Sequence, residues 1–461
     1  MDLTAELSEY CASLDYDTLP DSTVDQAKRV LLDTVGIAIG SVRAKSTSPV
    51  VDTLDSLDNG KGATALATGG SYSPAYAALA NATFAHSLDF DETHRAGSVH
   101  AAAPVLGTLL AVGEEVDATG RQLLTAFVGG YEITARLGMA LNSEAHYDKG
   151  FHATSTCGVY GATAAGCMLK GASAGTIETA FGVNGSQSSG TLQFLENGSW
   201  NKRIHPGLAA HSGYLATEFA HRDFFAASEP IEGPRGFLQA YSDDPRPEAA
   251  LDGLGDGFEI DRTGMKPYPV CRFMHPAIDG LIGLATEHDI DPAEVSAIEI
   301  GMSTSGKNIV GEPAKAYPES IVDAQFSMPF GAMLSVTRRE AGVDALFGAV
   351  DGDFDSEQRR LMDATTTTSV AWADELYPDK WAVEVAIDGK ERYDRRVEDA
   401  RGDPRTQLSW EEIRGKYDDL AAPVVGDTTA EAVRERIESL ETQSATTLLE
   451  PLRGAAFRDP Y

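Results

Sequence analysis

Apolar residues recur at helical spacing through the first half of the chain. One stripe follows a capping sequence at Ser22–Asp25 and consists of Val24, Ala27, Leu31, Val35 and Ala38. A capping box at Thr119–Gln122 precedes a second stripe, Leu123, Ala126 and Phe127. Glycines and alanines crowd these segments, which allows helices to pack closely. The first half therefore predicts a buried helical bundle.

The pattern changes near residue 265. Ile298–Met302 and Val383–Ile387 alternate as strands do, and Asp388-Gly389 is a good hairpin turn. Helical stretches at His275–His288 and Gln325–Thr337 lie between them. Near the end of the chain a helical face returns after a cap at Asp427-Thr428, with Val433, Ile437 and Leu440. We therefore predict a mainly α protein in which 1–264 and 405–461 form an all-helical domain and 265–404 form a smaller α+β domain.

Length and apolar content agree with this division. A chain of 461 residues is too long for one compact core, so two domains are expected. The longest apolar run, near Ala101–Gly113, is interrupted by Pro104 and is too short for a bilayer. The acidic start Met1–Glu6 lacks the basic region of a signal peptide. We expect a cytoplasmic protein with no membrane partner.

The charge is strongly negative. The chain has 70 acidic residues against 37 basic ones, a net charge of −33 spread along its length. A dispersed acidic excess with few lysines favours a surface adapted to high salt, as in a halophile, because salt screens self-repulsion. The alternative is an ordinary acidic cytosolic protein. Either way, nucleic acid is a poor partner for such a surface.

No cofactor signature is present. The four cysteines, which form no CxxC pair, argue against an iron–sulfur cluster and indicate reduced thiols: Cys11, Cys157, Cys167 and Cys271. The histidines lack carboxylate or thiol partners at metal-site spacing, and no HExxH, phosphate loop or dinucleotide fingerprint occurs. We expect no cofactor and no metal.

Candidate chemistry gathers in a few segments. Phe84–His94, followed by His100, is dense in acids and imidazoles, and Asp89 and Thr93 at i, i+4 would share a helix face. His152 stands at a helix entry, where unpaired N–H groups favour an anion. The simpler interpretations are a solvated acidic loop and a core histidine.

Two further segments carry cations. One holds Lys202, Arg203 and His205, and the other, stiffened by prolines, holds Lys266, Cys271, Arg272 and His275. The alternatives are a basic turn and a linker. In so acidic a chain, these cations indicate a local positive pocket for a carboxylate substrate.

Seven segments, taken together and in order, resemble the MmgE/PrpD family from near residue 5 to about 440. They are AHSLDFDETH, GFHATSTCG, NGSWNKRIHPGLAAHSG, EGPRGF, KPYPVCRFMHPAID, QFSMPFG and RGDPRTQLSWEEI. The family includes 2-methylcitrate dehydratases, cis-aconitate decarboxylases and iminodisuccinate epimerases. The resemblance implies an all-helical domain built from both chain ends, an α+β lid, a homodimer and a small polycarboxylate substrate.

The resemblance also implies site residues. Those matching the decarboxylase pocket are Asp89, Thr93, His100, His152, Lys202 and Lys266. We expect Asp89, His100, His152, Lys202 and Lys266 to be catalytic, and Thr93, Arg203, His205, Cys271 and Arg272 to bind substrate. Cys271 stands where the decarboxylase branch carries a histidine, which favours another reaction of the family.

We therefore predict a hydro-lyase that dehydrates 2-methylcitrate, in propionate metabolism, or a citrate-like substrate. A base would remove a proton next to a carboxylate, an acid would assist the leaving hydroxyl, and the lysines would stabilise the developing charge. Two alternatives remain: an epimerase, isomerase or decarboxylase acting on iminodisuccinate or cis-aconitate, and a non-catalytic binding protein.

Overall fold

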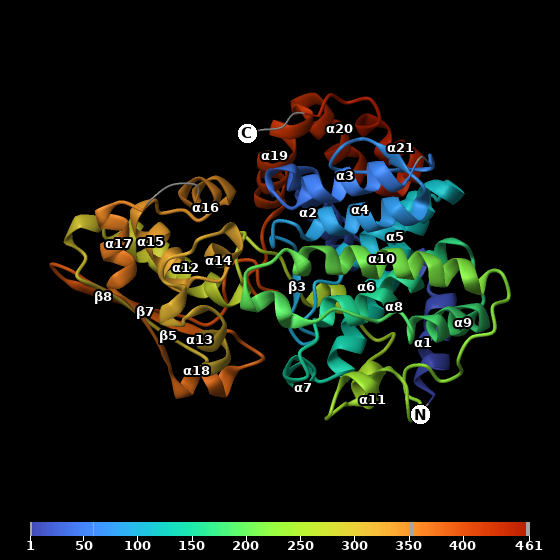
Figure 1. The fold of residues 1–461 in the computed structure, drawn as a ribbon, viewed down its shortest axis with the longest axis horizontal. Coiled ribbons are helices and arrows are strands. Elements are labelled where there is room, and N and C mark those ends of the chain that lie inside the picture. Colours follow the sequence, from blue (N-terminus) through green and yellow to red (C-terminus); the bar gives the residue numbers. More distant parts are fainter. Residues whose placement is uncertain (1, 59, 351–353, 458–461) are drawn as a thin grey trace. The chain divides into compact units, whose positions relative to one another are not determined.

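The computed structural model describes the whole chain except residues 1, 59, 351–353 and 458–461 (Figure 1). It divides into two compact units. The helical unit comprises Met1–Glu196, Trp200–Thr263 and Ser409–Tyr461, and the mixed unit comprises Asn197–Ser199 and Gly264–Leu408. The prediction of a mainly α protein with a small α+β part is confirmed.

Helices build almost all of the helical unit. They are α1 (Leu3–Ser13), α2 (Asp21–Gly40), α3 (Thr47–Leu57), α4 (Pro74–His86), α5 (Ala102–Val116), α6 (Gly120–Ala140), α7 (Ser143–Asp148), α8 (Ala153–Leu169), α9 (Ala174–Asn184), α10 (Asn201–Ala220), α11 (Phe237–Tyr241), α19 (Trp410–Val425), α20 (Asp427–Glu438) and α21 (Ala445–Leu449). Three two-residue strands also occur in it: β1 (Ala63–Thr64), β2 (Ser71–Tyr72) and β3 (Thr93–His94).

The predicted helices are present, but two predicted caps are misplaced. Helix α20 begins at Asp427 with Gly426 as its N-cap, so Asp427-Thr428 lies inside the helix, and Leu440 lies in a short 3-10 helix after it. The capping box of Thr119 and Gln122 opens α6 as predicted. Helix α2, however, begins at Asp21 with Pro20 as its N-cap, so Ser22–Asp25 lies inside the helix rather than before it. Pro20 has a fixed φ and no N–H to satisfy, which suits a helix start.

Small residues let these helices approach closely. A Cβ on Gly161 of α8 would lie 2.4 Å from the carbonyl oxygen of Gly130 on α6. A Cβ on Gly36 of α2 would lie 2.8 Å from the ring of Tyr417 on α19. Because α2 and α19 pack against each other, the two ends of the chain share one core.

A four-stranded sheet organises the mixed unit. Its order is β6 (Thr365–Ser369), β5 (Ala297–Met302), β7 (Val383–Asp388) and β8 (Arg392–Val397). Strands β5 and β6 are parallel and the other pairs antiparallel, with Ile298 opposite Ile387. The predicted strands at β5 and β7 and the hairpin after Asp388 are confirmed.

Helix α12 (His275–Glu287), predicted from the sequence, packs against β7 and β8. The predicted helix Gln325–Thr337 is two elements, α14 (Ile321–Gln325) and α15 (Met328–Thr337), because Ser327 caps a new helix start. The remaining helices are α13 (Thr304–Val310), α16 (Val343–Val350), α17 (Ser356–Asp363) and α18 (Ala371–Leu376). In neither unit is any described helix long and apolar enough to cross a membrane.

Candidate active site

The loop after α4 carries most of the acidic candidate residues. Helix α4 ends at His86, and Asp89 has a φ of 50° in the left-handed region, which aspartate tolerates better than most residues. Asp89 and Thr93 therefore do not share a helix face, and that prediction was wrong. The apolar run before His86 is helical, but the acidic segment after it is a turn leading into β3.

The C-terminal part of the chain holds this loop in place. Nζ of Lys416, on α19, donates to the carbonyl oxygen of Phe90 at 2.9 Å and lies 3.6 Å from the centroid of its ring. The same ammonium is 2.7 Å from Oδ1 of the buried Asp33 on α2. Lys416 thus fixes the backbone between Asp89 and Asp91. Sequence analysis did not identify this lysine.

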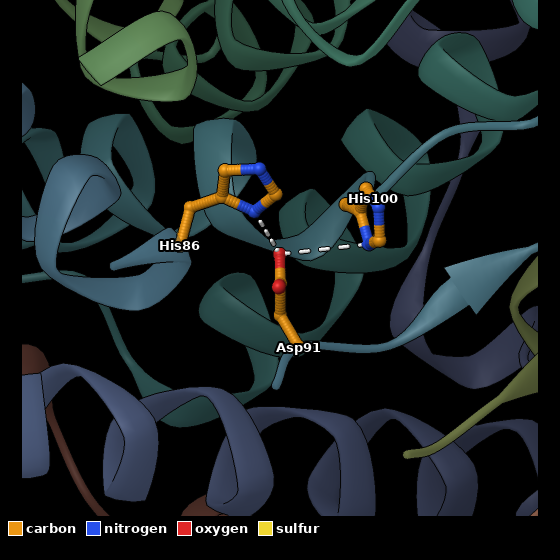
Figure 2. A group of neighbouring side chains, drawn as sticks. All are labelled: His86, Asp91 and His100. Atoms are coloured by element: carbon orange, nitrogen blue, oxygen red, sulfur yellow. Dashed lines mark hydrogen bonds and ion pairs between the residues drawn. The ribbon is translucent and has the colours of Figure 1, made fainter. Parts of the chain in front are cut away.

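Asp91 lies between two imidazoles (Figure 2). Its Oδ2 is 2.6 Å from Nδ1 of His86 and 3.8 Å from Nδ1 of His100, and both rings turn toward it. Nδ1 of His100 also lies 2.6 Å from the carbonyl oxygen of Glu92, and its backbone N–H donates to Oγ1 of Thr154 at 3.1 Å. The side chains of His86 and Asp91 are fully buried, whereas that of His100 is 13% exposed. His100 is therefore the member of this cluster that solvent or substrate reaches.

A second pair of imidazoles adjoins the first. Nδ1 of His152, the N-cap residue of α8, is 3.1 Å from Nδ1 of His205 on α10. The His152 ring lies 6.0 Å, centroid to centroid, from that of His86, which in turn lies 4.9 Å from His100. The four rings form one continuous cluster.

The environment keeps His152 and His205 neutral. Burial, followed by the nearby His205 and Lys202, holds the pKa of His152 well below its usual value. Burial, followed by His86 and Lys202, lowers the pKa of His205 to about 4. Two neutral rings joined through Nδ1 need one donor and one acceptor. One ring therefore carries its basic lone pair on Nε2 and the other carries an N–H there, which suits a base beside an acid.

Lys202 and Asp89 form an ion pair across 113 positions of the chain. Nζ of Lys202, in the first turn of α10, lies 2.8 Å from Oδ2 of Asp89, and their side chains are 15% and 6% exposed. An ammonium has three donors, so Lys202 can bind Asp89 and a substrate carboxylate together. Lys202 and His205 stand three positions apart on α10, and the positive charge of Lys202 helps to lower the pKa of both His152 and His205.

Arg203 and Thr93 interact less directly with the imidazole cluster. Nη1 of the buried Arg203 donates to Oγ of Ser46 at 3.0 Å, and burial, opposed by Asp89, lowers its pKa to about 10. Thr93 is buried in β3, and its Oγ1 has no hydrogen-bond partner among the described residues. His94 faces elsewhere and contacts Glu259 at 2.9 Å.

Lys266, Cys271 and Arg272 belong to the mixed unit. Arg272 forms an ion pair with Asp403, and its Nη1 lies 3.1 Å from Nδ1 of His275. The backbone N–H of Cys271 donates to the carbonyl oxygen of Gln325 at 2.8 Å, and among the described residues its thiol forms no disulfide. These contacts hold the proline-rich segment against the rest of its unit.

The structure thus brings together, within the helical unit, Asp89, His100, His152, Lys202 and His205. His86 and Asp91 lie within the acidic segment Phe84–His94, but no role was predicted for them. The density of acids and imidazoles in this segment was the signal in the sequence. It did not show that helix α4 ends at His86, and this helix end turns the His86 ring toward Asp91.

Side-chain atoms of His86, Asp91 and His100 lie within 4.8 Å of one another, as in some metal sites. Two contacts of 2.6 Å, however, engage the Nδ1 atoms with a carboxylate and a carbonyl oxygen at hydrogen-bond distance. A cation bound at the two Nδ1 atoms would have to displace both protons. The arrangement therefore favours a hydrogen-bonded cluster.

The helical unit, made from both chain ends, holds a buried cluster of imidazoles, carboxylates and a lysine, which are the side chains that acid/base enzymes use. The chain belongs to the MmgE/PrpD family: the N-terminal domain of that family matches residues 5–250 and its C-terminal domain residues 268–442. The resemblance noted in the sequence is therefore confirmed.

Named relatives span nearly the whole chain. It is 23% identical to a cis-aconitate decarboxylase of Aspergillus terreus (strain NIH 2624 / FGSC A1156), over 99% of this chain and 97% of that protein. It is 25% identical to the cis-aconitate decarboxylase of Mus musculus, over 96% of this chain and 91% of that protein. A shorter match, 26% identical over 49% of this chain and 47% of the relative, is the cis-aconitate decarboxylase of Homo sapiens.

Proposed function

We propose that this chain is a lyase that acts on a small di- or tricarboxylate by acid/base chemistry without an iron–sulfur cluster. The observation that carries the proposal is the buried Lys202–Asp89 ion pair beside the neutral imidazoles of His152 and His205. Membership of the MmgE/PrpD family supports it.

Lys202 binds a substrate carboxylate. Its ammonium lies in the first turn of α10, where the helix dipole also favours an anion. When a proton leaves the neighbouring carbon, negative charge spreads onto that carboxylate, and a fixed cation stabilises it. Asp89 keeps the ammonium in place.

The histidines move the protons. In dehydration, a neutral imidazole of His100 or His152 takes the proton from the carbon next to the carboxylate. The C–O bond at the adjacent carbon then breaks, and the hydroxyl leaves as water after taking a proton. If His152 is the base, it passes its Nδ1 proton to Nδ1 of His205 while His205 gives up its Nε2 proton, so both rings end neutral. If His100 is the base, its imidazolium N–H gives the proton to the leaving hydroxyl.

Further groups complete the proposal. As the family resemblance implies, we propose that Lys266 is a further cationic residue for a polycarboxylate substrate and that Thr93, Arg203, Cys271 and Arg272 bind substrate. We also propose a cytoplasmic homodimer that works at high salt, since the net charge of −33 requires screening.

The first candidate reaction is dehydration of 2-methylcitrate or a citrate-like acid. Cys271 supports it, because a thiol is a poorer acid–base group at neutral pH than the histidine of the decarboxylase branch. The second candidate is decarboxylation of cis-aconitate, which the names of the relatives favour.

A turnover screen in molar KCl tests the proposal, with 2-methylcitrate, citrate, cis-aconitate and iminodisuccinate as substrates. Proton NMR in heavy water separates the reactions: dehydration yields an alkene, decarboxylation releases carbon dioxide, and epimerisation gives only exchange and inversion. We expect an alkene from a hydroxylated tricarboxylate, and at least ~100-fold slower turnover in His152→Ala, as for loss of a general acid or base.

His211→Ala is the matched control, because His211 lies on α10 outside the cluster. It should turn over at the wild-type rate. Absence of turnover on all four acids, or a folded His152→Ala with a near-normal rate, would refute the proposal.

A further inference from the structure

We propose that Asp91, held by His86, is the buried counter-ion that positions and charges His100, so that His86 and Asp91 act on the reaction through that histidine. The inference rests on the proposed function, in which His100 is a base. Neither His86 nor Asp91 reaches solvent, so both are positioning residues rather than groups that touch substrate.

The tautomer of His100 follows from its contacts. Its Nδ1 lies 2.6 Å from the carbonyl oxygen of Glu92, which can only accept. The ring therefore carries its proton on Nδ1 and its basic lone pair on Nε2. A proton taken from substrate arrives at Nε2, and the positive charge it creates spreads over the whole ring.

Asp91 stabilises that charge. Its Oδ2 lies 3.8 Å from Nδ1 of His100 in a buried setting, where a charge is poorly screened by water. A carboxylate at this range favours the protonated form of an imidazole, by about 1–3 pH units in comparable cases. Asp91 therefore strengthens His100 as a base.

Other titratable groups surround the cluster from each neighbouring element. His86 ends α4, and Glu92 belongs to the same loop as Asp91 and accepts from the backbone N–H of Ala102. His152 stands at the start of α8. From α10 come Lys202, paired with Asp89, and His205. The Lys202 cation opposes protonation of His100, so Asp91 must outweigh it.

His86 fixes the direction of the Asp91 carboxylate. Its Nδ1 donates to Oδ2 at 2.6 Å, and that is the oxygen directed toward His100 (Figure 2). Its Nε2 is buried and has no hydrogen-bond partner within the part of the chain that the structure describes. The His86 ring therefore contributes through its hydrogen bond to Asp91.

The test uses the full-length protein labelled with 15N-histidine, in which NMR follows the titration of His100, assigned with His100→Gln. In Asp91→Asn we expect the midpoint of the His100 titration, and the acid limb of kcat/KM, to move down by at least about one pH unit. His86→Asn keeps a donor where Nδ1 stood and should match the wild type. His86→Leu lacks the donor and should shift as Asp91→Asn does.

Three results would overturn the inference. The first is an unchanged His100 titration in Asp91→Asn. The second is equal impairment of His86→Asn and His86→Leu, and these two variants also test the inference if Asp91→Asn does not fold. The third is stoichiometric, tight binding of Zn²⁺ that Asp91→Asn abolishes, which would make the cluster a metal site. Failure of the wild type to turn over any polycarboxylate refutes the proposed function instead, while the NMR titration still tests the counter-ion.

Discussion

Replacing Lys202 by methionine removes the positive charge beside the imidazole cluster and keeps the length of the side chain. In the wild type, Nζ lies 2.8 Å from Oδ2 of Asp89, and the two side chains are 15% and 6% exposed. The substitution therefore takes away both the proposed carboxylate ligand and the ion-pair partner of a buried aspartate.

The substitution should change both the turnover rate and the free energy of unfolding. Loss of one preorganised donor that stabilises transition-state charge slows turnover by ~100–1,000-fold. Breaking a buried ion pair lowers the free energy of unfolding by ~3–5 kcal/mol, and the 15% exposure of Lys202 places this case near the lower end. The double variant Lys202→Met/Asp89→Asn removes both charges of this pair, so it should regain part of the stability and none of the turnover. The recovery is partial because the charge of Asp89 also acts on the buried Arg203.

Lys28→Met is the matched control. Lys28 is also 15% exposed, and its Nζ lies 2.8 Å from a carboxylate oxygen of Glu441, outside the candidate site. Urea unfolding measures stability, and kcat/KM on the substrate found in the screen measures catalysis. Turnover of folded Lys202→Met within about tenfold of the Lys28→Met rate would refute the assigned role, since a transition-state ligand costs more than that.

Three more predictions concern pH, salt and reaction type. Because the pKa of His205 is about 4 in the folded protein and about 6.5 when unfolded, the unfolded chain binds the extra proton between these values. The free energy of unfolding should therefore fall as the pH drops from 6.5 to 4, by at most ~3 kcal/mol at about 1.4 kcal/mol per unit. The stability advantage of wild type over His205→Phe in urea titrations should shrink accordingly, and parallel pH curves would disprove this. Raising KCl from about 0.1 M to 1 M shortens the Debye length from about 10 to 3 Å, so KM for a tricarboxylate should fall several-fold, and a rise in KM would contradict the repulsion argument. Cys271→His should increase cis-aconitate decarboxylation at least tenfold over Cys271→Ser, measured as carbon dioxide release, and equal rates would show that this position does not select the reaction.

Elements specified by local sequence were predictable. The capping box at Thr119 and Gln122 and the hairpin after Asp388 involve residues only a few positions apart, so their geometry is encoded where they occur. Strand β6, Thr365–Ser369, was missed. Its apolar residues do not alternate with polar ones, so the local pattern does not indicate a strand. It forms a strand because it pairs in parallel with β5, which lies more than sixty positions earlier in the chain.

The site was only partly predictable for the same reason. The density of histidines and acids marked the loop after α4, but the pairing of Lys202 with Asp89 spans 113 positions and that of Lys416 with Phe90 spans 326. No local pattern encodes either contact. Asp89 and Thr93 were expected on one helix face because their spacing is helical, yet the helix ends at His86 and a left-handed turn follows.

The most direct test of the central claim is a crystal structure of the protein with the substrate found in the screen, or an unreactive tricarboxylate analogue, bound at high salt. We predict a carboxylate oxygen about 3 Å from Nζ of Lys202, with the reacting carbon facing the imidazoles of His100 and His152. A tricarboxylate bound at another site at full occupancy, with Lys202 contacting Asp89 but no ligand, would contradict the claim.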